Sequence, residues 1–343
     1  MKKIIFFTIL LCCICSLNLS AQNSSNNFDT SLNEVKTWFK AWDIVYKDVY
    51  QLKEIKPVDF VLFDETYVYT TSKLTGKDAV AIVGPSLSNK NLIWMKKEHN
   101  GKIMLPNSKE TEVGIMSYAS EVENGNAYFV MPLTSYWRKN KVDDHGIGID
   151  TLVNYVFLHE FAHTQQMKSL NDIGKVMEAY EKIHPNDKLD DDMLQYYYEN
   201  DSIYLKEYKI ERDLFQQAAL TKDKNKRVEL AKKALQLLKR RQINCLKKDG
   251  RDIAKIDNFW LTLEGIGEYT AFSWLIHPKG ANFSVEKALE ARKTKKWWSQ
   301  EQGFDIILLL SRFMEPKQFS KYMFGQTLTT AVDLLEKQLK KQH

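Results

Sequence analysis

The chain has 343 residues, enough to bury a large hydrophobic core in about two domains or lobes. Its 49 basic and 44 acidic residues give a formal net charge of +5, and no basic stripe with interleaved aromatic residues occurs, which argues against a nucleic-acid-binding protein. Three of the four cysteines lie in the first fifteen residues, so the rest of the chain keeps Cys245 alone and cannot form an internal disulfide bond.

The first 21 residues have the pattern of a secretory signal peptide. Lys2 and Lys3 give it a positive start, and the apolar run 4–14 is too short to span a membrane. Ala21 is a small residue at the cleavage position, so we expect a mature chain that starts near Gln22 and is secreted or periplasmic. An uncleaved anchor is the alternative. No later apolar run is long enough for a stable membrane span in the mature chain.

Residues 22–56 are predicted to be a polar tether followed by a helix over 32–52, where aromatic and branched side chains recur at helical spacing. From residue 57 the pattern changes to short β-branched or aromatic runs separated by glycine, proline and asparagine, which predicts a mixed sheet of about five strands. Pro132 suits an edge or a strand end, so the last of these runs is predicted to be the edge strand. His99 and His145 are expected in exposed loops. The predicted strands are 59–63, 67–71, 79–83, 92–94 and 126–133.

One stretch of the chain carries an H-E-x-x-H sequence. It lies in a helix predicted over 150–168, with Asp150 as the N-cap. Positions i and i+4 share a helix face, so His159 and His163 can direct two imidazoles at one metal ion, and neutral imidazole suits Zn²⁺. Glu160 can take a proton from a water molecule on that ion. The helix is apolar nearly all round, so it should be buried, where polar groups need partners.

The remainder of the chain is predicted to be helical, and one of its helices is informative. The segment 260–272 carries Glu264 and Glu268 one turn apart on one face, among apolar residues. Two carboxylates in such surroundings resist burial unless a cation and an imidazole N–H satisfy them, or unless they face water. Spacing alone allows either glutamate to be the metal ligand. The other predicted helices are 172–183, 190–219, 227–241, 306–313 and 326–339.

The H-E-x-x-H sequence, together with the downstream Glu-Gly-Ile-Gly-Glu-Tyr, resembles the gluzincin metallopeptidases, which include thermolysin-like and M1-aminopeptidase-like enzymes. The resemblance is specific over 155–166 and 260–272. It implies an α+β, zincin-like fold, in which an N-terminal mixed β-sheet lobe carries the H-E-x-x-H helix and a C-terminal lobe is mostly helical. From residue 163 to residue 264 is 101 positions, far more than the short spacer usual in this group. The resemblance is therefore to a divergent branch with a long insertion.

The resemblance also implies roles for the residues of the site. One zinc ion, Zn²⁺, would be held by His159, His163 and Glu264, and Glu268 would accept the free N–H of a histidine ligand. Related enzymes stabilise the oxyanion with a group from the lower lobe. The residues of this chain that could do so are Tyr269, His277, Arg312 and Tyr322.

These patterns divide the chain and predict its function. The expected divisions are the signal peptide 1–21, the tether and helix 22–56, the upper mixed-sheet lobe 57–168, a helical insertion 169–256 and a lower helical lobe 257–343 with the Glu ligand. We expect a secreted zinc metallopeptidase that hydrolyses peptide bonds of a peptide or protein substrate through a zinc-bound water activated by Glu160. The edge strand 126–133 would pair with an extended substrate. A non-catalytic gluzincin-like protein that binds a peptide or a partner is the alternative, because one fold hosts several roles.

Overall fold

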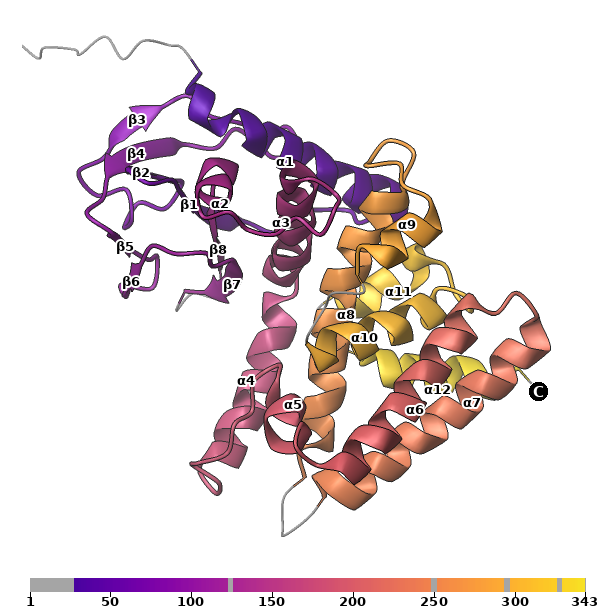
Figure 1. The fold of residues 1–343 in the computed structure, drawn as a ribbon. Helices are drawn as coiled ribbons and strands as arrows, with labels where there is room; N and C mark the ends of the chain where they lie inside the picture. Colours follow the sequence, from indigo (N-terminus) through magenta and orange to yellow (C-terminus); the bar gives the residue numbers. More distant parts are fainter. Residues whose placement is uncertain (1–27, 123–125, 248–251, 293–296, 326–328, 343) are drawn as a thin grey trace, which may run out of the picture.

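The computed structural model describes residues 28–122, 126–247, 252–292, 297–325 and 329–342. The predicted signal peptide, most of the tether and the start of the helix predicted at 326 lie outside these ranges. Figure 1 shows two parts side by side, a sheet-bearing N-terminal part and a mostly helical C-terminal part. The predicted α+β class, with a mixed sheet followed by a mainly helical region, is confirmed.

The helix predicted over 32–52 is present. A short helical turn, η1 (Thr30–Leu32), leads into α1 (Asn33–Ile44), which continues as a π-helical turn, η2 (Val45–Val49). The carboxylate of Asp29 accepts from the backbone N–H of Ser31 at 3.0 Å and so caps the start. The aromatic stripe of α1 is buried in the core, as its spacing predicts.

Six strands form one mixed sheet in the order β3-β4-β2-β1-β8-β7. β1 and β8 run parallel, with Phe60 opposite Phe129, and the other neighbouring strands are antiparallel. β5 (Lys102–Met104) and β6 (Glu110–Glu112) form a separate hairpin. The strands of the sheet are β1 (Val58–Phe63), β2 (Tyr67–Thr70), β3 (Val80–Ile82), β4 (Trp94–Glu98), β7 (Tyr118–Glu121) and β8 (Ala127–Pro132).

The prediction that 126–133 forms the edge strand is wrong. β8 lies between β1 and β7, so the edge on this side belongs to β7. Pro132 is the last residue of β8, and at a strand end the missing N–H of proline removes no hydrogen bond from the interior of the sheet. The sequence did not predict β7, because this strand is only four residues long and lacks an alternation of apolar and polar side chains.

Both faces of the sheet are covered. α1 and the H-E-x-x-H helix, α3 (Ile149–Gln165), pack on one face, and the β5–β6 hairpin packs on the other. This two-sided burial explains why β1 and β8 are apolar at successive positions. The strand residues on the helix side are Phe60, Leu62, Phe129 and Met131. Those on the hairpin side are Val61, Phe63, Tyr128 and Val130.

The helical region matches most of the predicted helices in position. The helix predicted over 306–313 runs over 298–310, and the short helices 134–139, 285–290 and 316–323 were not predicted. Two further differences concern where helices begin. Asp150 is not the N-cap of α3, because the helix follows Gly148, whose φ is +86°, and the Asp150 carboxylate instead pairs with Arg138 at 2.6 Å. The helix predicted over 190–219 is broken, because the carboxylate of Asp201 accepts from two backbone N–H groups and starts a new helix there. The other helices are α2 (Thr134–Lys139), α4 (Met167–Glu181), α5 (Met193–Tyr198), α6 (Ser202–Leu220), α7 (Lys224–Arg241), η3 (Gln242–Leu246), α8 (Ala254–Ile276), α9 (Val285–Glu290), α10 (Trp298–Leu310), α11 (Pro316–Met323) and α12 (Ala331–Lys340).

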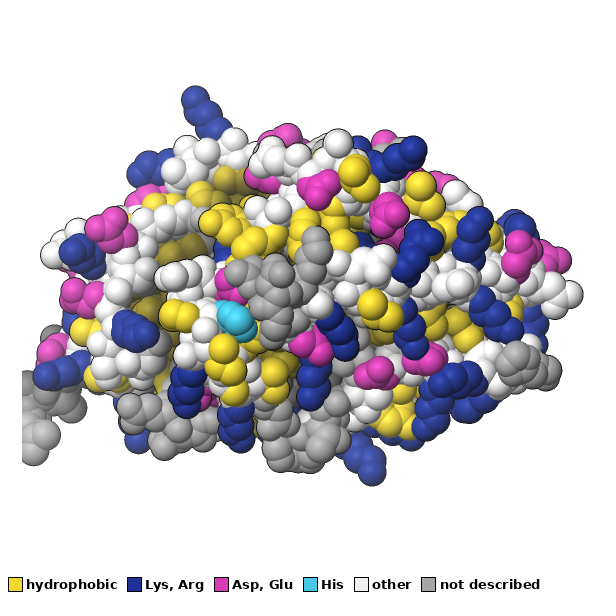
Figure 2. Space-filling model, turned by 90° about the horizontal axis from the view of Figure 1, so that it is seen from below, with side chains coloured by type: hydrophobic (Ala, Val, Ile, Leu, Met, Phe, Trp, Pro, Cys, Tyr) yellow, Lys and Arg dark blue, Asp and Glu magenta, His cyan; other side chains and the backbone are white. Residues whose placement is uncertain are grey.

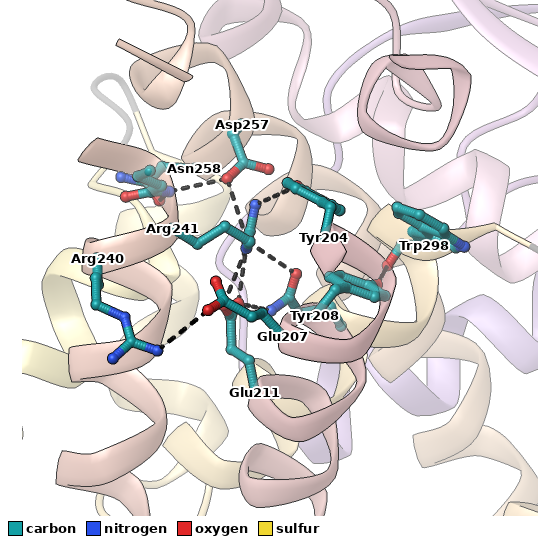
Figure 3. Close-up of polar contacts among 11 residues, drawn as sticks. Tyr204, Glu207, Tyr208, Glu211, Arg240, Arg241, Asp257, Asn258 and Trp298 are labelled. Atoms are coloured by element: carbon teal, nitrogen blue, oxygen red, sulfur yellow. Dashed lines mark hydrogen bonds and ion pairs between the residues drawn. The ribbon is translucent and has the colours of Figure 1, made fainter. Parts of the chain in front are cut away.

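Four of these helices meet at one buried guanidinium, that of Arg241 on α7. It donates to both carboxylate oxygens of Glu211 on α6, at 2.9 and 3.0 Å, and to the hydroxyl of Tyr204 at 2.8 Å. Asp257 of α8 lies 3.7 Å away, and the amide of Gln302 on α10 donates to Glu211. Figure 3 shows this network, which links α6, α7, α8 and α10.

The surface of the helical region is mixed in charge. On the face seen in Figure 2, Lys and Arg side chains are interspersed with acidic and apolar ones. Within the described ranges, none of the helices combines the length and apolarity needed to cross a membrane.

Candidate metal centre

The orientation of α3 is set by a pair of phenylalanines. Phe157 stacks on Trp38 of α1 at 5.5 Å between ring centroids, and Phe161 stacks on Phe60 of β1 at 5.8 Å. Residues two apart on a helix point about 200° apart. With the phenylalanines buried against the sheet and α1, His159 and His163 therefore face the opposite side, toward α8.

Two glycines let α8 come close to its neighbours. A Cβ atom on Gly267 would lie 2.9 Å from Nδ1 and Cε1 of His159, and one on Gly265 would lie 2.4 Å from the carbonyl oxygen of Gly303 on α10. α8 is thus packed tightly between α3 and α10, and the carboxylates of Glu264 and Glu268 point at the imidazoles.

The three residues expected to bind the metal lie together. Nε2 of His159 is 3.2 Å from Oε2 of Glu264 and 3.2 Å from Nε2 of His163, and the latter is 3.6 Å from Oε1 of Glu264. A tetrahedral zinc ion with bonds of about 2.0–2.1 Å holds its ligand atoms roughly 3.3 Å apart. The two imidazole nitrogens therefore lie at the separation of ligands around one such ion, and each lies 3.2–3.6 Å from a different carboxylate oxygen of Glu264.

The protonation states also suit a cation. Burial lowers the pKa of His163 to about 4, despite the opposing charge of Glu264, so its imidazole is neutral near pH 7. Burial would raise the pKa of Glu264, but the hydrogen bond from His159 and the two nearby imidazoles outweigh it and lower this pKa to about 2. A neutral imidazole and an ionised carboxylate are the forms that bind metal.

Glu268 supports His159 from the far side of the ring. Its Oε1 lies 3.0 Å from Nδ1 of His159, although the N–H is poorly aligned for a hydrogen bond. Its Oε2 accepts from the hydroxyl of Tyr155 and pairs with the guanidinium of Arg292. Arg292 is 7 % exposed and lies over the ring of Phe304, so a buried cation balances the buried carboxylate.

The other two donors are supported as well. Oε1 of Gln166 lies 3.2 Å from Nδ1 of His163, which leaves Nε2 of that ring directed toward Glu264. Gln300 of α10 hydrogen-bonds to Glu264 and contributes to its low pKa. Such outer partners orient metal ligands and fix the imidazole tautomers.

A cavity of about 410 Å³ adjoins the cluster. His159 and Glu160 form part of its wall, with the loop 142–147 before α3 and residues at the start of α10. The apolar part of the wall consists of Trp137, Val142, Ile147, Leu152, Val156, Ala291 and Trp297. Glu160 and His159 are therefore both reached from the same cavity.

Comparisons with protein-family models, with curated proteins and with solved structures gave no match to this chain. Its function is therefore inferred from the arrangement of its own residues.

The four residues considered for oxyanion stabilisation lie elsewhere. The ring of Tyr269 packs on Phe319 at 5.9 Å and its hydroxyl bonds to two serines, while His277 lies 3.8 Å from Asp48. Tyr322 lies in a groove between α11 and α12. In the part of the chain that the structure describes, neither these three nor Arg312 lines the cavity beside Glu160.

Several residues of the site were not expected from the sequence. Tyr155 precedes His159 by four positions, so helical spacing alone places it on the same face as the histidines. His145 is in a loop, as expected, yet it lines the cavity. Arg292 begins a Lys/Arg-rich stretch and carries no sequence signal that separates it from surface cations.

Proposed function

We propose that the protein is a gluzincin-like zinc metallopeptidase that hydrolyses peptide bonds outside the cytoplasm. The observation that carries the proposal is that Nε2 of His159 and Nε2 of His163 lie 3.2 Å apart and that each lies within 3.6 Å of one of the two carboxylate oxygens of Glu264, close to the spacing of zinc ligands. Three protein ligands of this kind leave a fourth position open, which is typical of catalytic zinc sites. The same sheet-then-helix order is implied by the resemblance to gluzincins.

Glu160 is the proposed general base. A bound zinc ion would act as a Lewis acid that lowers the pKa of a water molecule and polarises the carbonyl group. Glu160 directly follows His159 and lines the cavity, so its carboxylate can accept a proton from the attacking water and deliver it to the leaving amine nitrogen. Glu268, with Arg292 behind it, holds the imidazole of His159 in place.

The edge strand that would pair with an extended substrate is β7. In the described sheet it is the outermost strand beside β8, and it packs next to α3. Addition of a substrate strand to such an edge would supply main-chain hydrogen bonds, while the apolar wall of the cavity would receive a side chain.

The test is Glu160→Gln, with Glu181→Gln on the exposed end of α4 as a matched control. We expect Glu160→Gln to keep one zinc ion per chain by elemental analysis and to lose cleavage of a peptide library, while Glu181→Gln keeps both. Wild-type protein that holds zinc but leaves the library uncut at several pH values would refute the proposal. Peptide binding that persists in both variants without cleavage would point to the non-catalytic alternative.

A further inference from the structure

A groove of about 700 Å³ lies between the C-terminal half of α7, with η3, and α12. These helices lie on the side of the helical part that is away from the sheet (Figure 1). The apolar lining of the groove consists of Leu235, Ile243 and Leu339, and none of its lining residues belongs to the metal centre. A role for this groove is therefore independent of the function proposed above.

Ile243 is exposed at a position where a polar residue is expected. It follows Arg240 by three positions and Gln236 by seven, so the three side chains share the outward face of α7 and η3. Gln236 and Arg240 are polar and exposed, whereas Ile243 is apolar and 62 % exposed. Contact with water forgoes the free energy that burial of this side chain would gain.

Two more isoleucines are exposed beside this groove. Ile203 and Ile210 lie seven positions apart on one face of α6, and they are 75 % and 46 % exposed. With Leu237 of α7 they line a second groove, which shares Arg240 with the first. Single exposed apolar side chains are normal, whereas apolar side chains gathered around grooves are typical of a surface that contacts another molecule.

The lining of the groove between α7 and α12 carries more positive than negative charge. Its basic residues are Lys232, Lys239, Arg240 and Lys340, and its acidic residue is Glu336. Hydrogen bonds from Lys239 and Lys340 lower the pKa of Glu336, so its carboxylate is ionised and already pairs with two ammonium groups, at 2.6 and 3.0 Å. The remaining positive charge attracts acidic side chains and disfavours basic ones.

We propose that this groove binds an acidic amphipathic helix of a partner protein. The space between two neighbouring helices fits a third helix, which presents apolar side chains at positions i, i+3, i+4 and i+7 to such a groove. Ile243 and Leu339 contact that apolar stripe. Lys232 of α7 and Lys340 of α12 pair with acidic side chains on its two flanks. A hollowed surface of this kind suits a helix better than it suits a flat lipid bilayer.

The experiment uses the whole chain after the predicted signal peptide and a synthetic peptide of about 18 residues, long enough to form a helix. This acidic peptide carries leucines along one helix face and glutamates on both flanks. A rearranged peptide has the same composition in an order that gives no apolar face. Fluorescence anisotropy of the labelled peptides should show that the acidic peptide binds at least about tenfold more tightly than the rearranged one. Its Kd should rise with salt concentration, because the flanking charges are exposed.

Variants of the protein test the seat of the peptide. Ile243→Asp should raise the Kd of the acidic peptide about tenfold or more, because it replaces an apolar anchor by a repelling charge. Lys232→Glu should raise the Kd about 2–5-fold, because it reverses one exposed charge. Ile183→Asp and Lys40→Glu make the same changes at exposed positions outside the groove, and both should leave the Kd unchanged.

The proposal is overturned if the acidic peptide binds no better than the rearranged one, or if Ile243→Asp and Lys232→Glu, shown to be folded by circular dichroism, bind it as the wild type does. Two other occupants are measured alongside. Vesicles that contain phosphatidylglycerol test a lipid surface, and sedimentation of the protein alone tests a second copy of this chain. Vesicle binding or self-association that Ile243→Asp removes, without selective binding of the acidic peptide, would assign the groove to that occupant and contradict the proposal.

Discussion

The close approach of Gly267 to His159 allows the metal centre to be perturbed without removing any ligand. In Gly267→Ala, the new methyl group would lie 2.9 Å from two atoms of the imidazole, where ordinary contact begins at 3.4 Å. The ring must therefore retreat by about 0.5 Å, or α8 must move away by the same distance. The ring has little freedom to move, because Glu264 and Glu268 contact its two nitrogens.

The expected loss of zinc affinity in Gly267→Ala follows from the cost of displacing a metal ligand. Losing the outer partner of a ligand typically weakens metal affinity about 10–100-fold, and a shift of half an ångström in a ligand itself should cost at least about tenfold. A tenfold loss of affinity corresponds to about 1.4 kcal/mol. Replacing a helical glycine by alanine also stabilises a helix by about 1 kcal/mol, so the unfolding temperature of the metal-free protein is a poor readout.

Zinc affinity is the appropriate assay, measured by competition with a chromophoric chelator. Gly174→Ala is the matched control, because it lies inside α4 with nothing within 4 Å of the added methyl group. It should raise the free energy of unfolding by about 1 kcal/mol and leave zinc affinity unchanged. Wild-type zinc affinity in Gly267→Ala would show that α3 and α8 do not hold His159 as described.

Two further predictions concern carboxylates. Glu264→Ala should abolish stable zinc binding, whereas Glu268→Ala should leave a site that binds zinc about 10–100-fold more weakly. Metal content is measured on both variants, with circular dichroism to exclude unfolding. Full zinc occupancy in Glu264→Ala with none in Glu268→Ala would reverse the two roles. Burial raises the pKa of Glu34 from 4.5 to about 7, although its carboxylate accepts the backbone N–H of Thr134 at 2.9 Å. Between these two pH values the folded protein binds more protons than the unfolded chain, so the free energy of unfolding should fall as pH rises, by up to about 3 kcal/mol at about 1.4 kcal/mol per pKa unit. Glu34→Gln should remove this fall in denaturant titrations at pH 5 and pH 8, and parallel behaviour of variant and wild type would contradict the assignment.

The sequence predicted those parts of the fold that local patterns determine. α1, α3, α7 and α8 have clear apolar periodicity or uniform apolarity and were predicted. The bounds of α1, α3 and α7 agree within about three residues, with η2 counted as part of α1, whereas α8 extends beyond its predicted range at both ends. β7 and the β5–β6 hairpin were missed, because strands of three or four half-exposed residues carry little signal before they are paired.

The site residues also separate into those that the sequence indicates and those that only the folded structure identifies. His159 and His163 are indicated by their spacing within one helix. The apolar surroundings single out Glu264 and Glu268 together, and only the resemblance to gluzincins assigns the ligand role to Glu264. The roles of Arg292 and Gln300 depend on contacts between segments far apart in the chain. Their residue types are common on surfaces, and only the folded arrangement separates them from solvated side chains.

The buried Arg241 has a consequence for how the protein opens in solution. If α6 and α7 separated, Arg241 and Glu211 would be left unpaired in an apolar interior, at a cost of about 3–5 kcal/mol. Separation of α8 or α10 would remove the contacts of Asp257 and Gln302 with this pair. We therefore expect these four helices to exchange their amide hydrogens as one cooperative unit, whereas α4 and α5, which have no part in this network, open at lower free energy. Because α8 belongs to the cooperative unit, Glu264 and Glu268 keep their positions against α3 while the neighbouring helices fluctuate.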